Sequence, residues 1–207
     1  MGLDAAAFTL DVYVKPTNPL GAWVGQTLIS QGDVVFAAGT GGWQIYVMGD
    51  ATGANAVYRF ITKNPVSQYL ADSALLPTGV WYYIRCRITG RTPGNTIRIS
   101  VNAGAEVSNA CTTAAVASAE HLWHGRCGGA THRHWKGAIC YVHAWNIDKG
   151  ALGAVPATPF AVDANTVGRW IHSDGAGAQL TDTSGNANHG AIAGAAWSAT
   201  VPAGWTI

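Results

Sequence analysis

The segment richest in potential metal ligands is Asp182-Thr-Ser-Gly-Asn-Ala-Asn-His-Gly190. The carboxylate of Asp182 and the amide oxygens of Asn186 and Asn188 are hard ligands of the kind that Ca²⁺ takes. Asp and Asn in a glycine-rich loop also bond their own backbone and tolerate left-handed geometry. The sequence therefore leaves two interpretations open: a weak calcium site, and a loop held by its own hydrogen bonds. Apart from calcium, we expect no cofactor.

The nine tryptophans of the chain offer a second kind of site, because an indole combines an apolar face with a polar edge and can stack on a sugar ring. Those in or next to expected loops are Trp23, Trp43, Trp123 and Trp205. We expect these four to be exposed and assign the first three to carbohydrate binding. Those in strand patterns, expected in the core, are Trp81, Trp145 and Trp170.

A group of histidines and one cysteine between His121 and His134 could serve as zinc ligands. However, Cys127 has no cysteine at zinc-module spacing, and His132 and His134 have the two-residue spacing of a strand. A solvated loop and strand edge is the preferred interpretation. Of the other cysteines, Cys86 and Cys140 lie in apolar strand patterns typical of buried thiols. A disulfide between Cys111 and Cys127 stays open.

Catalysis of glycoside hydrolysis needs two carboxylates that flank the sugar bond. The chain has eleven acids, only two of them glutamates, and no strand pattern carries acids at a spacing that would place two on one sheet face. No Gly-x-Ser-x-Gly elbow occurs either. The sequence therefore predicts that the protein is not an enzyme.

The composition and the start of the chain argue against nucleic-acid binding, membrane insertion and a secretion signal. Only 11% of residues are charged and the net charge is +1, so no basic surface for nucleic acid is expected. No apolar stretch reaches the roughly 18 residues of a membrane-spanning helix, so no membrane insertion is expected. The start of the chain, Met1 to Leu10, shows no basic region followed by an apolar one, so no signal peptide is expected.

Short apolar runs separated by turn residues, with 26 glycines in 207 residues, predict an all-β chain. In the longest pattern, Gly79–Ile88, the even-numbered residues from Tyr82 to Ile88 share one face, which we expect to be buried, whereas Arg85 and Arg87 lie on the other. Leu152–Asp163, with two prolines, is expected to be an extended connector. We predict one domain over residues 1–207, a two-sheet antiparallel β-sandwich. The other expected strands are 8–14, 27–30, 34–37, 43–48, 56–62, 96–101, 135–145 and 167–172, and a helical turn is allowed within 110–120.

Four segments resemble the concanavalin A-like lectin/glucanase superfamily, in its laminin G-like branch. Phe8–Pro16 resembles an early strand that ends in Lys-Pro, and Leu76–Ile84 resembles a strand entered through Gly-x-Trp. Trp135–Asn146 resembles the late strand, and Asp182–Gly190 resembles the D-x-S-G-N-x-N-x-G loop. The resemblance implies a jelly-roll sandwich, and it allows calcium at the loop.

The order of these segments departs from the family, in which the D-x-S-G-N loop precedes the early strand. Here the loop, and the strand pattern Val167–His172 before it, come last. Either the chain is circularly permuted, which is physically cheap when sandwich termini lie close together, or its last strand completes the sheet of a neighbouring domain or subunit.

Domains that resemble this one are common in bacteriophage virion proteins. The resemblance therefore implies a non-catalytic virion surface protein, a head decoration or fibre module. Such a protein would dock on capsid or tail proteins as a homo-oligomer and present a face to cell-surface glycans. The low charge and the absence of a visible signal peptide favour this interpretation. The alternative is a secreted or cell-surface carbohydrate-binding module from a longer bacterial protein.

Overall fold

The computed structural model describes residues 3, 7–17, 25–32, 42–63, 67–90, 92–112, 121–126 and 134–206. Strands joined by turns make up these ranges, without a helix, and so without a helix able to span a membrane. The all-β prediction is confirmed. The strands are β1 (Phe8–Pro16), β2 (Gly25–Gln31), β3 (Gly42–Gly49), β4 (Asn55–Lys63), β5 (Gln68–Asp72), β6 (Leu76–Pro77), β7 (Tyr82–Ile88), β8 (Thr96–Val101), β9 (Val107–Ala110), β10 (Leu122–His124), β11 (Gly137–Trp145), β12 (Thr166–Ile171), β13 (Gln179–Leu180) and β14 (Gly190–Ala191).

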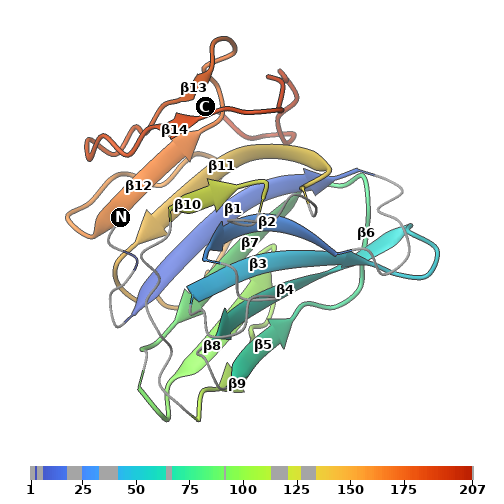
Figure 1. Cartoon of the computed structure of the whole chain (residues 1–207), viewed down its shortest axis with the longest axis vertical. Coiled ribbons are helices and arrows are strands. Elements are labelled where there is room, and N and C mark those ends of the chain that lie inside the picture. The colour runs from blue at the N-terminus through green and yellow to red at the C-terminus, as the bar shows by residue number, and fades with distance from the viewer. Residues whose placement is uncertain are drawn as a thin grey trace.

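The strands form two stacked antiparallel sheets (Figure 1). The first, sheet A, has the order β12-β11-β1-β7-β8-β9. The second, sheet B, has the order β10-β2-β3-β4-β5, with β6 beside β4. A small ladder of β13 and β14 lies beyond β12 at one end of the molecule. This is the predicted sandwich.

The core lies between the sheets and follows the alternation of the strands. Tyr82, Ile84, Cys86 and Ile88 of β7 all belong to it, as their pattern predicts. On β1 the residues Phe8 to Val14 alternate in the same way, so every second side chain faces sheet B. Aromatic rings join the two layers, since the Phe8 ring centroid lies 5.2 Å from that of Trp43 on β3.

The outer face of sheet A is buried as well, which the alternating pattern alone does not predict. Tyr83 and Arg85, on this face of β7, are 0% and 5% exposed. The predicted connector runs along this face, where Leu152 packs in the same apolar cluster as Trp205 and Tyr83. Trp205, expected to be exposed, is buried because its ring packs against Tyr13, Tyr83 and Tyr141.

The C-terminal strand pattern belongs to the sheet of its own chain. β12 pairs with β11 in antiparallel register, with Val142 opposite Trp170. Sheet A is therefore completed without a strand from a neighbour, which favours a permuted order over strand exchange.

Two expectations lie outside the described residues, namely the strand over 34–37 and most of the stretch allowed a helical turn, residues 113–120.

Candidate functional site

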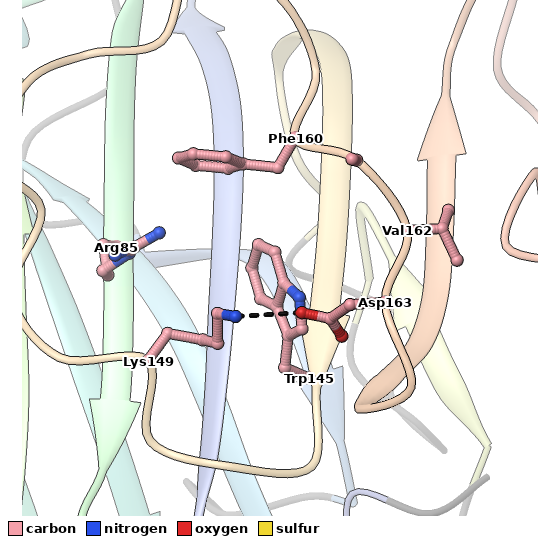
Figure 2. Close-up of a pocket in the computed structure, with 7 residues that line it drawn as sticks. Arg85, Trp145, Lys149, Phe160, Val162 and Asp163 are labelled. Atoms are coloured by element: carbon pink, nitrogen blue, oxygen red, sulfur yellow. Dashed lines mark hydrogen bonds and ion pairs between the residues drawn. The ribbon is translucent and has the colours of Figure 1, made fainter.

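A hollow with a volume of about 350 Å³ opens on the outer face of sheet A. It is lined by Arg85 of β7, Trp145 at the end of β11, Lys149 in the following loop, and residues 160–163 of the connector that leads into β12. Figure 2 shows the Arg85, Lys149, Phe160 and Asp163 side chains arranged around the Trp145 ring. Three stretches distant in sequence thus meet at one place.

Arg85, which lines the hollow, belongs to a buried ion pair. The Arg85 guanidinium donates from Nε and Nη2 to the two carboxylate oxygens of Asp11 on β1, each at 2.7 Å. The Tyr83 hydroxyl donates to the same carboxylate at 2.7 Å. Burial raises the pKa of Asp11, and its hydrogen bonds with Arg85 and Tyr83 oppose that rise. Asp11 is fully buried and does not line the hollow, so it holds Arg85 in place and is not itself a ligand contact.

One wall is the Trp145 ring, which stacks on His143 with 3.7 Å between ring centroids. His143 is fixed in turn by Tyr141, whose hydroxyl lies 2.8 Å from Nδ1, and by Thr166, whose Oγ1 lies 3.1 Å from Nε2. Burial lowers the pKa of His143 to about 3, so the imidazole is neutral at pH 7. The indole Nε1 of Trp145 is buried and has no hydrogen-bond partner.

The rim carries a charged pair that solvent reaches. Lys149 Nζ lies 2.9 Å from Asp163 Oδ2, and about a third of each side chain is exposed. Burial acts to raise the pKa of Asp163, but the hydrogen bonds from Lys149 and from the backbone N–H of Asn165 lower it below its usual value. The carboxylate is therefore ionised at neutral pH and offers an acceptor beside an ammonium donor.

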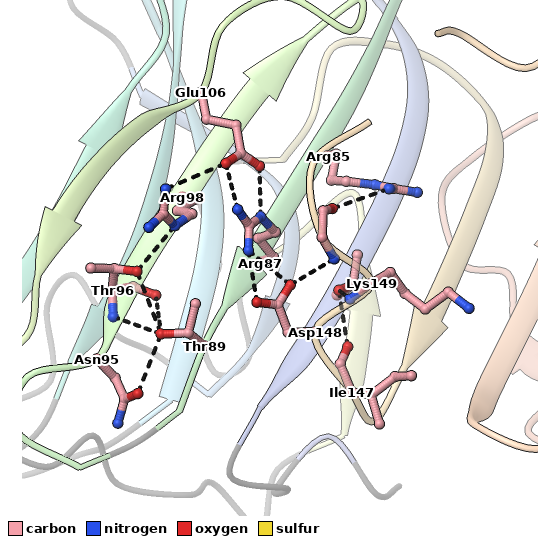
Figure 3. A network of polar contacts seen from close by, with 12 residues as sticks. Arg85, Arg87, Thr89, Asn95, Thr96, Arg98, Glu106, Ile147, Asp148 and Lys149 are labelled. Atoms are coloured by element: carbon pink, nitrogen blue, oxygen red, sulfur yellow. Dashed lines mark hydrogen bonds and ion pairs between the residues drawn. The ribbon is translucent and has the colours of Figure 1, made fainter. Parts of the chain in front are cut away.

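A network of polar contacts fixes the loop that presents Lys149 (Figure 3). Arg87 donates from Nη1 to both oxygens of Asp148, at 2.9 and 2.7 Å, and from Nε to Glu106 at 2.6 Å. The backbone N–H of Lys149 donates to Thr9 Oγ1 at 2.9 Å. The hydrogen bond with Arg87 lowers the pKa of Glu106, so the network stays charged near neutrality.

Of the three tryptophans that the sequence assigns to carbohydrate binding, Trp43 and Trp123 do not line this hollow. The prediction for Trp43 is wrong: the residue is 1% exposed, its ring packs in the core, and its Nε1 donates to Gln31. Trp123 lies on β10 of sheet B, half-buried, with the Arg126 guanidinium 4.5 Å from its ring centroid. Trp23 lies outside the described residues. Trp123 and Trp23 therefore stay predictions.

The Asp182 carboxylate holds the D-x-S-G-N loop through hydrogen bonds from the loop itself and from β12. Asp182 Oδ1 accepts the N–H of Arg169 at 3.0 Å and that of Ser184 at 2.9 Å. Oδ2 accepts the Ser184 hydroxyl at 2.8 Å and the N–H of Asn188 at 2.9 Å. Burial acts to raise the pKa of Asp182, but these hydrogen bonds lower it overall. A carboxylate so engaged does not fit Ca²⁺ in this arrangement, which favours the second of the two interpretations.

The other loop residues bond to the outer edge of β12. Asn186 Nδ2 donates to the carbonyl oxygen of Thr166 at 2.8 Å, and Asn188 Nδ2 donates to that of Val167 at 2.8 Å. The N–H of Thr183 donates to the carbonyl oxygen of Arg169 at 2.8 Å. The loop thus forms hydrogen bonds with backbone groups on the outer edge of β12 that would otherwise be free to pair with a further strand.

Asp182→Ala is expected to lower the free energy of unfolding by about 2 kcal/mol, because it leaves the N–H groups of Arg169, Ser184 and Asn188 without their acceptor. Urea denaturation with and without calcium measures the loss, which should be the same in both. A wild-type midpoint that calcium raises, with no such rise in the variant, would instead establish the metal site.

The histidine and cysteine group does not assemble a metal site among the described residues. His124 stacks on His172 of the segment after β12, with 5.7 Å between ring centroids and an interplanar angle of 10°. The sequence pattern did not connect these two. Cys111 is a buried free thiol, as are Cys86 and Cys140, and Cys127 and His132 lie outside the described residues.

Sequence reasoning placed Trp145 in the core but missed the rim residues Lys149, Phe160 and Asp163. The sequence does contain one feature that points to these rim residues. The proline-containing connector carries an aromatic residue and an acid three positions apart, Phe160 and Asp163. A connector expected to be extended gives no indication of which sheet face it will cover.

Comparisons with known proteins agree with the geometry of the fold. A family profile for the concanavalin A-like lectin/glucanases superfamily matches residues 2–154. The Asp182–Gly190 loop lies beyond the matched range. No curated protein sequence matches the chain.

Two solved structures illustrate the likeness. The CBM40 module of the Ruminococcus gnavus IT-sialidase has a TM-score of 0.54 at 13% identity, over 72% of this chain and 79% of that one. The binding domain of botulinum neurotoxin DC, in complex with SialylT, has a TM-score of 0.42 at 11% identity, over 58% of this chain and 27% of that one. At 13% identity, the likeness to the CBM40 module shows only a shared fold. The likeness to the neurotoxin domain, with its lower TM-score, carries no argument. With the sandwich described above and a profile that spans most of the sequence, the chain belongs to the concanavalin A-like lectin/glucanases superfamily.

Proposed function

We propose that this domain is a non-catalytic carbohydrate-binding module and that the hollow beside Trp145 is its sugar site. The observation that carries the proposal is the composition of the hollow. The half-buried ring of Phe160 lies beside an accessible charged pair, Lys149 and Asp163, and a buried indole N–H without a partner. A sugar ring has apolar C–H faces and a rim of hydroxyls, so it matches an aromatic surface bordered by donors and acceptors.

The state of the acids supports a binding role and not hydrolysis. Asp11 and Arg85 are paired, as are Glu106 and Arg87, and both acids are mostly or fully buried. Among the acids that the structure describes, a net rise in pKa, as a general acid requires, is found at Asp11, which is 0% exposed. Asp163 is the carboxylate that lines the hollow. A glycosidase needs a second carboxylate across the sugar bond.

The biological setting stays a hypothesis. A bacteriophage virion surface, with capsid or tail proteins as partners and a homo-oligomeric state, rests on the sequence resemblance. The alternative is a secreted or cell-surface module of a longer protein, and the R. gnavus structure is named as the CBM40 of a sialidase. Glycan binding serves both settings. Immunodetection of the chain on purified phage particles, against detection in culture medium or on cell surfaces, separates them.

Phe160→Ala is expected to weaken glycan binding by about tenfold, because it removes an aromatic ring from the lining of the hollow. A glycan array identifies a bound sugar, and calorimetry on that sugar compares the variant with wild type. Leu75→Ala is the matched control, since Leu75 is 52% exposed and does not line the hollow. Wild-type protein that binds no glycan, or a Phe160→Ala variant that binds as well as wild type, would refute the assignment of this site.

A further inference from the structure

We propose that the hollow recognises a hydroxyl group of a neutral sugar and discriminates against acidic sugars. The inference rests on the proposed carbohydrate-binding function and specifies its ligand. It follows from the polar groups of three residues that line the same hollow, Trp145, Lys149 and Asp163: an indole N–H, an ammonium and a carboxylate.

The Trp145 indole is a donor that lacks an acceptor. The residue is 1% exposed, and its Nε1 has no hydrogen-bond partner. An indole nitrogen can only donate, and an unpaired buried donor is costly. In the view of Figure 2 the nitrogen lies on the Asp163 side of the ring, away from Arg85. A ligand oxygen placed between the ring and the rim would accept this N–H.

The Asp163 carboxylate is an acceptor with capacity left. Its Oδ1 accepts the N–H of Asn165 at 2.9 Å and the Thr166 hydroxyl at 3.3 Å. Its Oδ2 accepts one N–H of Lys149 and belongs to a side chain that is 38% exposed. A carboxylate oxygen takes more than one hydrogen bond, so Oδ2 favours a ligand that donates to it.

A hydroxyl meets both requirements, because it accepts from Trp145 Nε1 and donates to Asp163 Oδ2. The carboxylate of an acidic sugar could accept from the indole but would bring a negative charge to Asp163. An ammonium group could donate to Asp163 but could not accept from the indole, and it would meet Lys149 and Arg85.

Charge around the hollow is balanced. Arg85 is paired with Asp11, and Lys149 is paired with Asp163, so the four groups carry no net charge. No cation of the hollow is left to neutralise an acidic ligand unless Lys149 gives up its partner. Phe160 and Val162, the latter 38% exposed, complete the lining with apolar surface for the C–H groups of the ring.

The test uses matched glycan pairs, one neutral oligosaccharide and the same oligosaccharide carrying a sialic or uronic acid, in calorimetry with the whole chain. Wild type is expected to bind the neutral member about tenfold more tightly, with little change between low and high ionic strength. Asp163→Asn removes the negative charge and keeps an acceptor oxygen, so it should shift the ratio about tenfold toward the acidic member.

Asp174→Asn is the matched control, because it makes the same charge change in the segment between β12 and β13, outside the hollow. It should leave the ratio unaltered, and urea denaturation of both variants verifies folding. The inference is overturned if wild type prefers the acidic member, or if Asp163→Asn leaves the ratio as it was. In either case, binding that Phe160→Ala weakens would preserve the proposed function. If the protein bound neither member of any pair, the inference and the proposed function would both be refuted.

Discussion

Asp11→Ala is expected to lower the free energy of unfolding by about 3–5 kcal/mol. Asp11 is 0% exposed and accepts two hydrogen bonds from Arg85, which is 5% exposed, so its removal leaves a buried guanidinium without its anion. The Tyr83 hydroxyl loses its acceptor in the same step. Urea denaturation with linear extrapolation measures the loss.

The double variant Asp11→Leu/Arg85→Met is the control for this prediction. Replacing both charges by apolar side chains of similar size should recover most of the stability, because no buried charge is left unpaired. A loss below about 1 kcal/mol for Asp11→Ala would show that the pair is better solvated than its burial indicates.

Acidification is expected to destabilise the protein strongly between about pH 6.5 and pH 4. Burial lowers the pKa of His143 and of His124 to about 3 and that of His172 to about 4. The unfolded chain binds protons at these side chains from about pH 6.5 downward, while the folded chain does not. Stability is therefore complete above that pH and falls below it, until the pH reaches the folded pKa values.

Below about pH 6.5, each histidine lowers the free energy of unfolding by about 1.4 kcal/mol per pH unit. The three together therefore lower it by roughly 6 kcal/mol at pH 5. Urea midpoints measured from about pH 7 to pH 5 report the slope. His124→Phe keeps a ring against His172 and Trp170 and should reduce the slope by about one third. His121→Phe, an exposed ring next to β10, is the control for ring size. A midpoint independent of pH would contradict the prediction.

Most of the sandwich could be predicted because strand alternation is a local property of the sequence. The pattern Gly79–Ile88 correctly placed the residues of β7 that face the core between the sheets, and Thr96–Val101 matched the bounds of β8. β5 and β9 were not predicted. Their sequences, Gln-Tyr-Leu-Ala-Asp and Val-Ser-Asn-Ala, lack a strong apolar alternation, and both strands lie at sheet edges, where pairing with a neighbour decides the structure.

The site was less predictable because it depends on what covers a sheet face. A tryptophan beside a glycine turn, Trp43, was expected to be exposed, but the side chain faces the opposite sheet and packs on Phe8. Phe160 and Asp163 reach the hollow because the connector folds back over sheet A, which no local spacing encodes. The Asp182 loop was recognised by its residues, but its hydrogen bonds to β12 depend on the position of that strand at the edge.

The loop from Asp182 to Asn188 also determines in which direction sheet A can grow. An unpaired edge strand is a template on which another chain can add by backbone hydrogen bonds. At β12 the loop already occupies the N–H and carbonyl groups of Arg169 and the carbonyl groups of Thr166 and Val167. At the opposite edge β9 is exposed along its whole length. Strand addition to sheet A is therefore one-sided: it is blocked at β12, and lateral assembly of copies through this sheet would have to begin at β9.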